Sequence, residues 1–391
     1  MKTLVLFAVL VELLALEETT LTEFKLGNNL FTSDIYKELL KQQSGNFLIS
    51  PFSLETVLSL TLTGARGQSA EEMRTSLRLP SNEVEIFEKL ISELKSDKYT
   101  LLSANKVYVK DGYPIHDGFK KIATEKYQAD FQNIDFGKKE EAVKEINEWV
   151  EARTKNRIHD IISANDIDEL SRLILINALY FKGNWSTPFP EGLTHPKDFY
   201  PKETEAVSVD TMHVTASFHY YECTEVDAKF LELFFEDRDA SMVVVLPNEK
   251  NGLGKLESKI EKVFTPRNFT TELVQVSIPK FKVETSIEFV EILKKLGMRK
   301  VFNGKEADLS GMAGEPGELE IGKILQKTFI DVKEGGVEAA AATIVHVPAV
   351  ISALEPDLRV PKNFKADHPF IFYLKVKEVV LFGGRILIPG K

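Results

Sequence analysis

The chain has 391 residues, of which 43% are hydrophobic and 28% are charged. These proportions are ordinary for a globular protein that buries a large core, so they exclude a mainly disordered chain. A net charge of −10 argues against general nucleic-acid binding, because such binding depends on Lys and Arg that neutralise phosphates. The 26 Phe residues indicate large sheets with helices packed on them.

The N-terminus has the pattern of a secretory signal peptide. Lys2 precedes an apolar run from Leu4 to Leu16 that is too short to span a bilayer, and Ala15 is a candidate cleavage residue. We therefore expect a signal peptide over residues 1–16 and secretion of the mature chain. The alternative is a first helix that is not cleaved. Sequons at Asn184 and Asn268 fit a secretory route as possible glycosylation sites.

Cys223 is the single cysteine, so no intramolecular disulfide can form and the fold must depend on its core. We expect its side chain to be buried like a small apolar residue. The alternatives are an intermolecular disulfide or a redox role.

Helical patterns come mainly early in the chain and strand patterns mainly late. Helical spacing covers Leu30 to Leu40, a helix start is predicted near Ser53, and further helical patterns cover Glu85 to Leu94 and Lys139 to Val150. Runs typical of strands are Leu173 to Phe181, Val243 to Leu246, Val274 to Phe281, Phe370 to Val376 and Val379 to Ile388. This order favours an α+β fold. No later apolar run reaches 18 residues and no repeat or linker is present, which predicts one domain over residues 17–391 and no membrane span.

The segment from Gly335 to Thr343 is small-residue-rich and lies between strand-like runs. Its alanines would form a helix by propensity, and a short surface helix is one interpretation. As a strand it would alternate, with small or β-branched side chains from Val337 to Val347 on one side and Glu338 and His346 on the other. Pro348 would end this strand. Such ambiguity is typical of a segment that changes state.

Five segments resemble motifs of the serpin family, in the family's order along the chain. They are Asn46 to Ser53, Ile146 to Glu151, Asn177 to Trp185, Glu334 to Thr343 and Phe364 to Phe370. The resemblance implies a fold with three β-sheets, roughly nine helices and an exposed reactive-centre loop within residues 334–360. It also implies a monomeric protease inhibitor, not an enzyme, without a cofactor or metal.

The same resemblance assigns the site residues. The hinge of the reactive-centre loop comprises Glu334, Gly335, Gly336, Val337, Glu338, Ala339, Ala340, Ala341, Ala342 and Thr343. The side chains implied beneath the opening strands, in the shutter and breach, are Ser50, Ser53, Asn177, Trp185 and Gln326. Gln326 stands where the family usually has His, and Val337 stands where it usually has a smaller residue.

The resemblance implies that a target protease attacks the loop and becomes covalently attached while the cut loop inserts into the large sheet. Family spacing from the hinge places the scissile bond at Val350–Ile351, whereas counting back from Phe370 places it near Leu358, Arg359 and Val360. We favour Val350–Ile351, since the inward alternation stops just before it. This bond suits an elastase-like or broad-specificity serine protease; a trypsin-like enzyme would suit Arg359–Val360, and a papain-like cysteine protease is a further alternative.

Two other classes of function compete with this interpretation. Gly317 to Lys323 has the spacing of a phosphate-binding loop, but Ile324 replaces the Ser or Thr that would hold magnesium. Ser310 lacks the glycine elbow of a hydrolase, and the seven histidines form no metal-ligand pattern. The stronger competitor is a non-inhibitory serpin that acts as a carrier, storage protein or chaperone, although the alanine-rich hinge favours inhibition.

Overall fold

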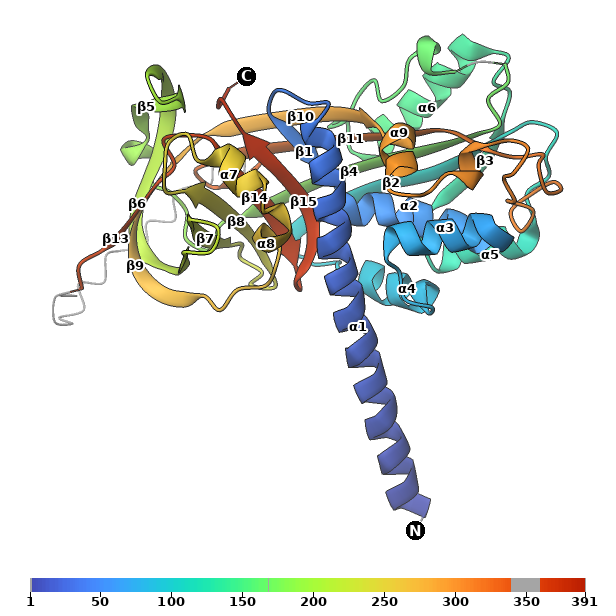
Figure 1. The fold of residues 1–391 in the computed structure, drawn as a ribbon, viewed down its shortest axis with the longest axis horizontal. Helices are drawn as coiled ribbons and strands as arrows, with labels where there is room; N and C mark the ends of the chain where they lie inside the picture. Colours follow the sequence, from blue (N-terminus) through green and yellow to red (C-terminus); the bar gives the residue numbers. More distant parts are fainter. Residues whose placement is uncertain (1, 168, 339–358, 391) are drawn as a thin grey trace.

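The computed structural model describes residues 2–167, 169–338 and 359–390, and two hydrogen-bonded sheets organise them (Figure 1). The six-stranded sheet has the order β10-β11-β12-β4-β2-β3. Its strands are β2 (Tyr99–Lys110), β3 (Asp130–Ile134), β4 (Leu173–Asn184), β10 (Phe281–Glu288), β11 (Ile321–Lys333) and the short β12 (Gly336–Val337).

The nine-stranded sheet follows the order β1-β15-β14-β8-β7-β6-β9-β13, with β5 paired to β6. Its strands are β1 (Phe47–Ile49), β5 (His195–Lys202), β6 (Glu205–Cys223), β7 (Ala228–Phe234), β8 (Ala240–Pro247), β9 (Thr270–Pro279), β13 (Lys362–Lys365), β14 (Phe370–Val376) and β15 (Val379–Ile386). The resemblance led us to expect three sheets. Here the long β6 pairs with β5, β7 and β9 in turn, and so it joins two groups of strands into one hydrogen-bonded path.

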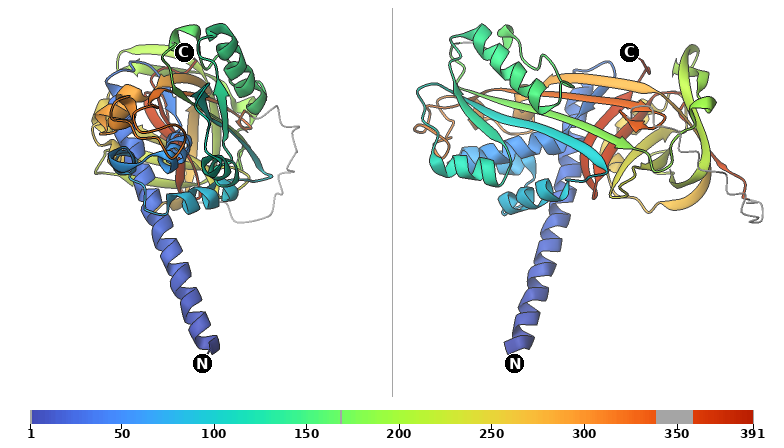
Figure 2. Two further views of the ribbon diagram at one scale, coloured as in Figure 1. Left: turned by 90° about the vertical axis from the view of Figure 1, so that its right-hand side faces the viewer. Right: turned by 180° about the vertical axis from the view of Figure 1, so that it is seen from behind.

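Helices cover both faces of the six-stranded sheet. The helices of the described chain are α1 (Lys2–Leu40), α2 (Pro51–Gly64), α3 (Gly67–Leu77), α4 (Glu83–Glu93), α5 (Asp117–Glu125), α6 (Lys139–Arg153), α7 (Leu253–Glu257), α8 (Ile260–Val263) and α9 (Val290–Lys295), with 3-10 turns at Ala164–Asp166, Glu191–Leu193 and Lys300–Phe302. Of these, α7 packs on β8 of the nine-stranded sheet. In Figures 1 and 2, α6 lies on one face of the sheet, and α2 to α5 lie on the other. The α+β class is confirmed.

The core is divided by the six-stranded sheet. The larger cluster lies on the α2 side and includes Leu175, Leu179 and Val332, whereas the smaller cluster lies under α6 and includes Ile176, Tyr180 and Phe329. This division follows from the two-residue period of a strand. Cys223 is buried, as predicted.

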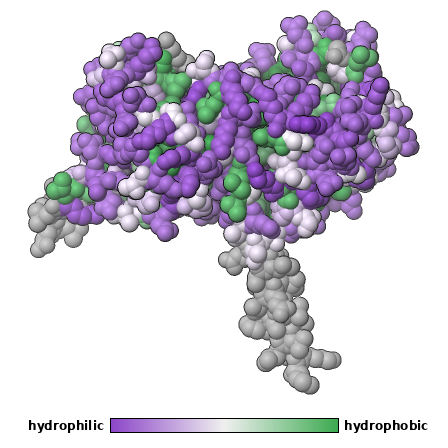
Figure 3. Space-filling view, in the orientation of Figure 1, coloured by the Kyte–Doolittle hydropathy of each residue, from purple (hydrophilic) through white to green (hydrophobic). Residues whose placement is uncertain are grey.

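The segment predicted to be a signal peptide belongs to α1, which runs without interruption from Lys2 to Leu40 and projects away from the sheets at its N-terminal end (Figures 1 and 2). Removal of residues 1–16 therefore stays a prediction. Among the described residues, no helix combines the length and apolar character needed to cross a membrane. Figure 3 shows a mainly hydrophilic face on which hydrophobic residues are scattered.

Candidate functional site

The boundary between β4 and β11, here called the seam, is closed along most of its length and occupied at one end. The two strands pair in parallel from Leu173 with Ile321 to Tyr180 with Phe329. Beyond this stretch β12 lies between them. Val337 pairs with Gly183 on β4 and with Val332 on β11, both antiparallel. Two residues of the predicted hinge, Gly336 and Val337, therefore already form a short central strand of the sheet.

The two residues of β12 are suited to this narrow place. The Val337 side chain is fully buried within the larger core cluster, as an inward-facing strand residue should be. Gly336 has φ 151°, and a Cβ added there would lie 2.0 Å from the backbone oxygen of Gly183. Because no side chain fits that space, glycine is required for β12 to enter the seam.

Glu338 follows β12 and faces the α6 side of the sheet. Its backbone N–H donates to the Asp331 oxygen at 2.7 Å, and its carboxylate accepts a hydrogen bond from the Tyr180 hydroxyl. Arg157 lies 3.4 Å from the same carboxylate. Burial, followed by the contact with Glu338, raises the pKa of Tyr180, so the hydroxyl remains a hydrogen-bond donor. These three contacts hold Glu338, the last hinge residue that the structure describes, beside the seam.

The other side of the hinge is fixed by Trp185 and Glu334. The Trp185 indole stacks on Phe235 at 4.6 Å, its Nε1 donates to the Lys333 oxygen at 3.0 Å, and its backbone N–H donates to the Gly335 oxygen at 2.9 Å. Glu334 pairs with Lys280 at 3.1 Å. Burial alone would raise the pKa of Glu334, but its hydrogen bonds and this lysine hold that pKa below the usual value.

The predicted shutter residues form one buried network beneath the seam. Gln326 accepts from the Ser50 backbone N–H at 2.9 Å, and its amide donates to the Ser50 oxygen at 2.8 Å and to Asn177 Oδ1 at 2.5 Å. The Asn177 amide donates to the Ser53 backbone oxygen at 2.8 Å. Ser50 also begins α2, where its hydroxyl accepts the Ser53 N–H at 3.4 Å. The structure thus brings together Ser50, Ser53, Asn177 and Gln326, and it places Trp185 at the hinge end of the seam.

Three residues of this site, Asn105, Tyr180 and Arg157, were not predicted. Asn105 on β2 accepts from Asn177 at 2.5 Å and from the Ser53 hydroxyl at 3.2 Å, so it completes the shutter network. Tyr180 and Arg157 hold Glu338, as described above. Tyr180 lies within the Asn177 to Trp185 motif. The two-residue alternation of that strand places it on the face opposite Asn177, and this was the one signal in the sequence for its contact with Glu338.

The remaining predicted residues lie in the reactive-centre loop or at the sequons. Ala339 to Thr343, Val350, Ile351 and Leu358 lie outside the described residues. Val360 is exposed and precedes β13, which pairs in parallel with β9. Both sequon residues are exposed, Asn184 at the end of β4 and Asn268 in the loop before β9. Their glycosylation stays a prediction. Within the described ranges, no group of three His, Cys, Asp or Glu residues is placed to hold a metal ion.

Comparison with known proteins identifies the family. A protein-family model described as "Serpin (serine protease inhibitor)" matches residues 26–389. The chain belongs to the serpin family. Serpins are generally protease inhibitors, which agrees with the expectation drawn from the motifs.

Individual serpins match over nearly the whole length of the chain. Antichymotrypsin-2 of Bombyx mori is 34% identical over 92% of this chain and 96% of its own length. Human Serpin B3 is 33% identical over 93% of this chain and 98% of its own length. The crystal structure of Serpin48, described as a highly specific serpin in the insect Tenebrio molitor, superposes with a TM-score of 0.88 at 46% identity and covers 94% of this chain and 98% of that one. The serpin fold is therefore shown.

Proposed function

We propose that this serpin inhibits proteases as a suicide substrate whose cut loop inserts fully into the six-stranded sheet. The observation that carries the proposal is the position of Gly336 and Val337, which already pair with β4 and β11. A strand that has entered one end of the seam can extend by the same antiparallel pairing. Insertion then continues an existing ladder and needs no new nucleus.

Extending the observed register of β12 supports insertion of the loop between β4 and β11. If the pairs of Val337 with Gly183 and Val332 continue along both strands, Thr343 comes to lie opposite Asn177 and Gln326. The Thr hydroxyl, which can both donate and accept, would then join the shutter network. Odd-numbered residues from 339 to 347 would face the larger cluster, and all of them are Ala, Thr or Val.

The energy of insertion is sufficient for an irreversible step. About ten additional ladder hydrogen bonds at ~0.5–1.5 kcal/mol each contribute roughly 5–15 kcal/mol, and burial of the inward-facing side chains adds to this. That is comparable to the whole stability of an ordinary domain. The uncut protein is accordingly a kinetically trapped state.

The proposal extends to the class of target protease and to secretion of this serpin. Val350–Ile351 is the proposed scissile bond, which suits an elastase-like or broad-specificity serine protease. Residues 1–16 support secretion, the two exposed sequons support a glycoprotein, and we propose that the protein is a monomer that forms a covalent complex with its target.

Incubation of the purified protein with elastase, trypsin and papain tests the proposal. An adduct that survives boiling in detergent is expected with at least one protease. Clean loop cleavage by all three, without an adduct, would instead favour the carrier, storage or chaperone alternative. The papain arm separates a cysteine-protease inhibitor from a serine-protease inhibitor.

A further inference from the structure

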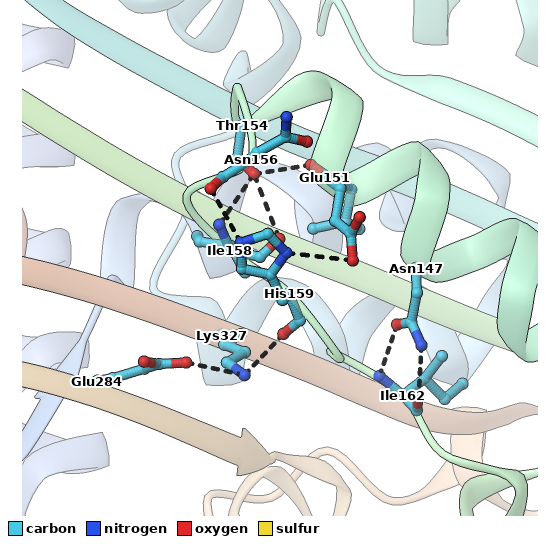
Figure 4. A network of polar contacts seen from close by, with 10 residues as sticks. Asn147, Glu151, Thr154, Asn156, Ile158, His159, Ile162, Glu284 and Lys327 are labelled. Atoms are coloured by element: carbon cyan, nitrogen blue, oxygen red, sulfur yellow. Dashed lines mark hydrogen bonds and ion pairs between the residues drawn. The ribbon is translucent and has the colours of Figure 1, made fainter.

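The loop after α6 crosses the outer face of the six-stranded sheet and is bound to β11 through Lys327 (Figure 4). Lys327 Nζ donates to the backbone oxygen of His159 at 2.7 Å and to Glu284 Oε1 on β10 at 2.9 Å. The Lys327 side chain is only 12% exposed. Because water is largely excluded, this charge-assisted hydrogen bond is stronger than an exposed one. The loop is thus coupled to the β10–β11 side of the seam.

The same loop is otherwise held by α6. The Asn147 side chain donates to the Ile162 oxygen at 2.9 Å and accepts the Ile162 N–H at 3.2 Å (Figure 4). The helix itself is fixed to β3, since Trp149 and Arg153 both donate to Asp130, at 3.1 and 2.5 Å. The bond from Lys327 to the His159 oxygen therefore joins groups that lie on opposite sides of the seam.

The ring of His159 fixes the conformation of this loop. Its Nδ1 lies 3.2 Å from the Glu151 carboxylate of α6, and its Nε2 lies 2.9 Å from the Asn156 backbone oxygen. Both neighbours are hydrogen-bond acceptors. A neutral imidazole has one N–H and satisfies one of them, whereas the imidazolium has two and satisfies both. Only the imidazolium can therefore donate to Glu151 and Asn156 at the same time.

Other charged groups surround the ring. Lys327 and Glu284 face the loop from β11 and β10, as described above. Asp160 follows the ring in the chain. The cleft beside the loop is also lined by Arg157, Lys182, Lys282, Asp331, Lys333 and Glu338. Glu151 remains the carboxylate within ion-pair distance of the imidazole, and so it is the partner whose removal tests the contact.

We propose that His159 is a positioning residue for strand insertion: its imidazolium, held between Glu151 and Asn156, stiffens the loop that binds Lys327 and thereby slows opening of the seam in acid. Insertion separates β4 from β11 by one strand spacing, about 4.8 Å. A hydrogen bond cannot span that change, so either Lys327 releases the loop or the loop deforms. Histidine changes charge between about pH 5 and 8. The inference rests on the proposed function, since insertion is the step that it regulates.

Annealing of a labelled peptide with the sequence of residues 338–347 measures seam opening without a protease. We expect the wild-type chain to take up the peptide about two- to five-fold more slowly at pH 5.5 than at pH 8, the size typical of an exposed ion pair. His159→Gln and Glu151→Gln should abolish this ratio. Lys327→Met should take up the peptide faster at both pH values and also lose the ratio.

The control is His195→Gln, which removes a histidine from β5 and should keep the wild-type ratio. Gln326 in place of a shutter histidine removes another source of pH dependence, and the peptide's own histidine is present in every sample. An unchanged ratio in His159→Gln would refute the role of His159 alone. Failure of the peptide to enter the wild-type seam at either pH would contradict insertion itself, and with it the proposed function.

Discussion

Val337 lies directly opposite Gly183, with its side chain fully buried in the core. Replacing it by arginine would place a charge where insertion must begin, and burial of an unpaired charge is strongly unfavourable. We expect Val337→Arg to turn the inhibitor into a substrate, which is cleaved at the wild-type rate but forms no stable adduct. Gel analysis of the adduct measures this. Val337→Thr is the control and should retain inhibition; an adduct with Val337→Arg would contradict the entry point proposed.

Gly336→Ala should expel β12 from the seam before any cleavage. The added Cβ would contact the Gly183 oxygen, and the φ of 151° disfavours any side chain, so the inserted state should lose roughly 2 kcal/mol or more. Fluorescence of Trp185, whose indole bonds to Lys333 beside β12, reports the change. Gly118→Ala is the matched control, because its Cβ would meet no atom within 4 Å. Identical spectra for Gly336→Ala and the wild type would argue against the effect.

The shutter network predicts a large cost for an apolar residue at position 326. Gln326→Leu would leave the Ser50 N–H and Asn177 Oδ1 without partners, at about 1–3 kcal/mol each, whereas the Ser50 oxygen keeps the Leu54 N–H at 3.1 Å. We therefore expect urea to unfold this variant at a clearly lower concentration. Gln326→His keeps one donor and one acceptor, so it should lose less stability and should acquire a pH-dependent midpoint. A midpoint for Gln326→Leu equal to that of the wild type would show that the network contributes little.

We predict that the contribution of Glu55, on α2, to the free energy of unfolding falls as the pH rises. Its side chain is fully buried and accepts a hydrogen bond from Asn28, and burial raises its pKa to about 8. The unfolded chain releases this proton near pH 4.5, whereas the folded chain keeps it. The stabilisation is therefore complete below pH 4.5 and is lost progressively up to about pH 8, by about 1.4 kcal/mol per pH unit.

Glu55→Gln tests this dependence, because glutamine keeps an acceptor for Asn28 and does not ionise in this range. The difference between wild type and variant in the free energy of unfolding, measured in urea from pH 5 to pH 8, should change by several kcal/mol. Parallel curves would mean that Glu55 does not carry the predicted proton.

The mass of the peptide released from a protease complex fixes the scissile bond. Cleavage at Val350–Ile351 should release a C-terminal fragment that begins at Ile351, because the inward-facing pattern ends at Pro348. A fragment that begins at Arg359 or Val360 would assign the cut to the alternative bond and lengthen the inserted strand.

The sequence predicted those parts of the site that local motifs specify. Ser50, Ser53 and Asn177 lie in short motifs. Gly336 has a backbone conformation that requires glycine, so the residue type itself indicates the requirement. Asn105 is one of several polar residues of β2, beside Ser103 and Lys106, and its role depends on the register of β2 with β4, which pairs Asn105 with Asn177. Arg157 reaches Glu338 across 181 positions of the chain, so no local pattern could indicate it. The long β6 was missed because its side chains alternate irregularly between exposed and buried.

β13 has a consequence for how long the uncut protein keeps its activity. Only four residue pairs, from Lys362 with Val274 to Lys365 with Ser277, attach it to β9. While they hold, the chain between β12 and β13 is anchored at two different sheets. Once they separate, the same segment could fill the seam without being cut, leaving nothing for a protease to attack. If the protein inhibits proteases as proposed, its storage life should therefore depend on a strand that never contacts the shutter.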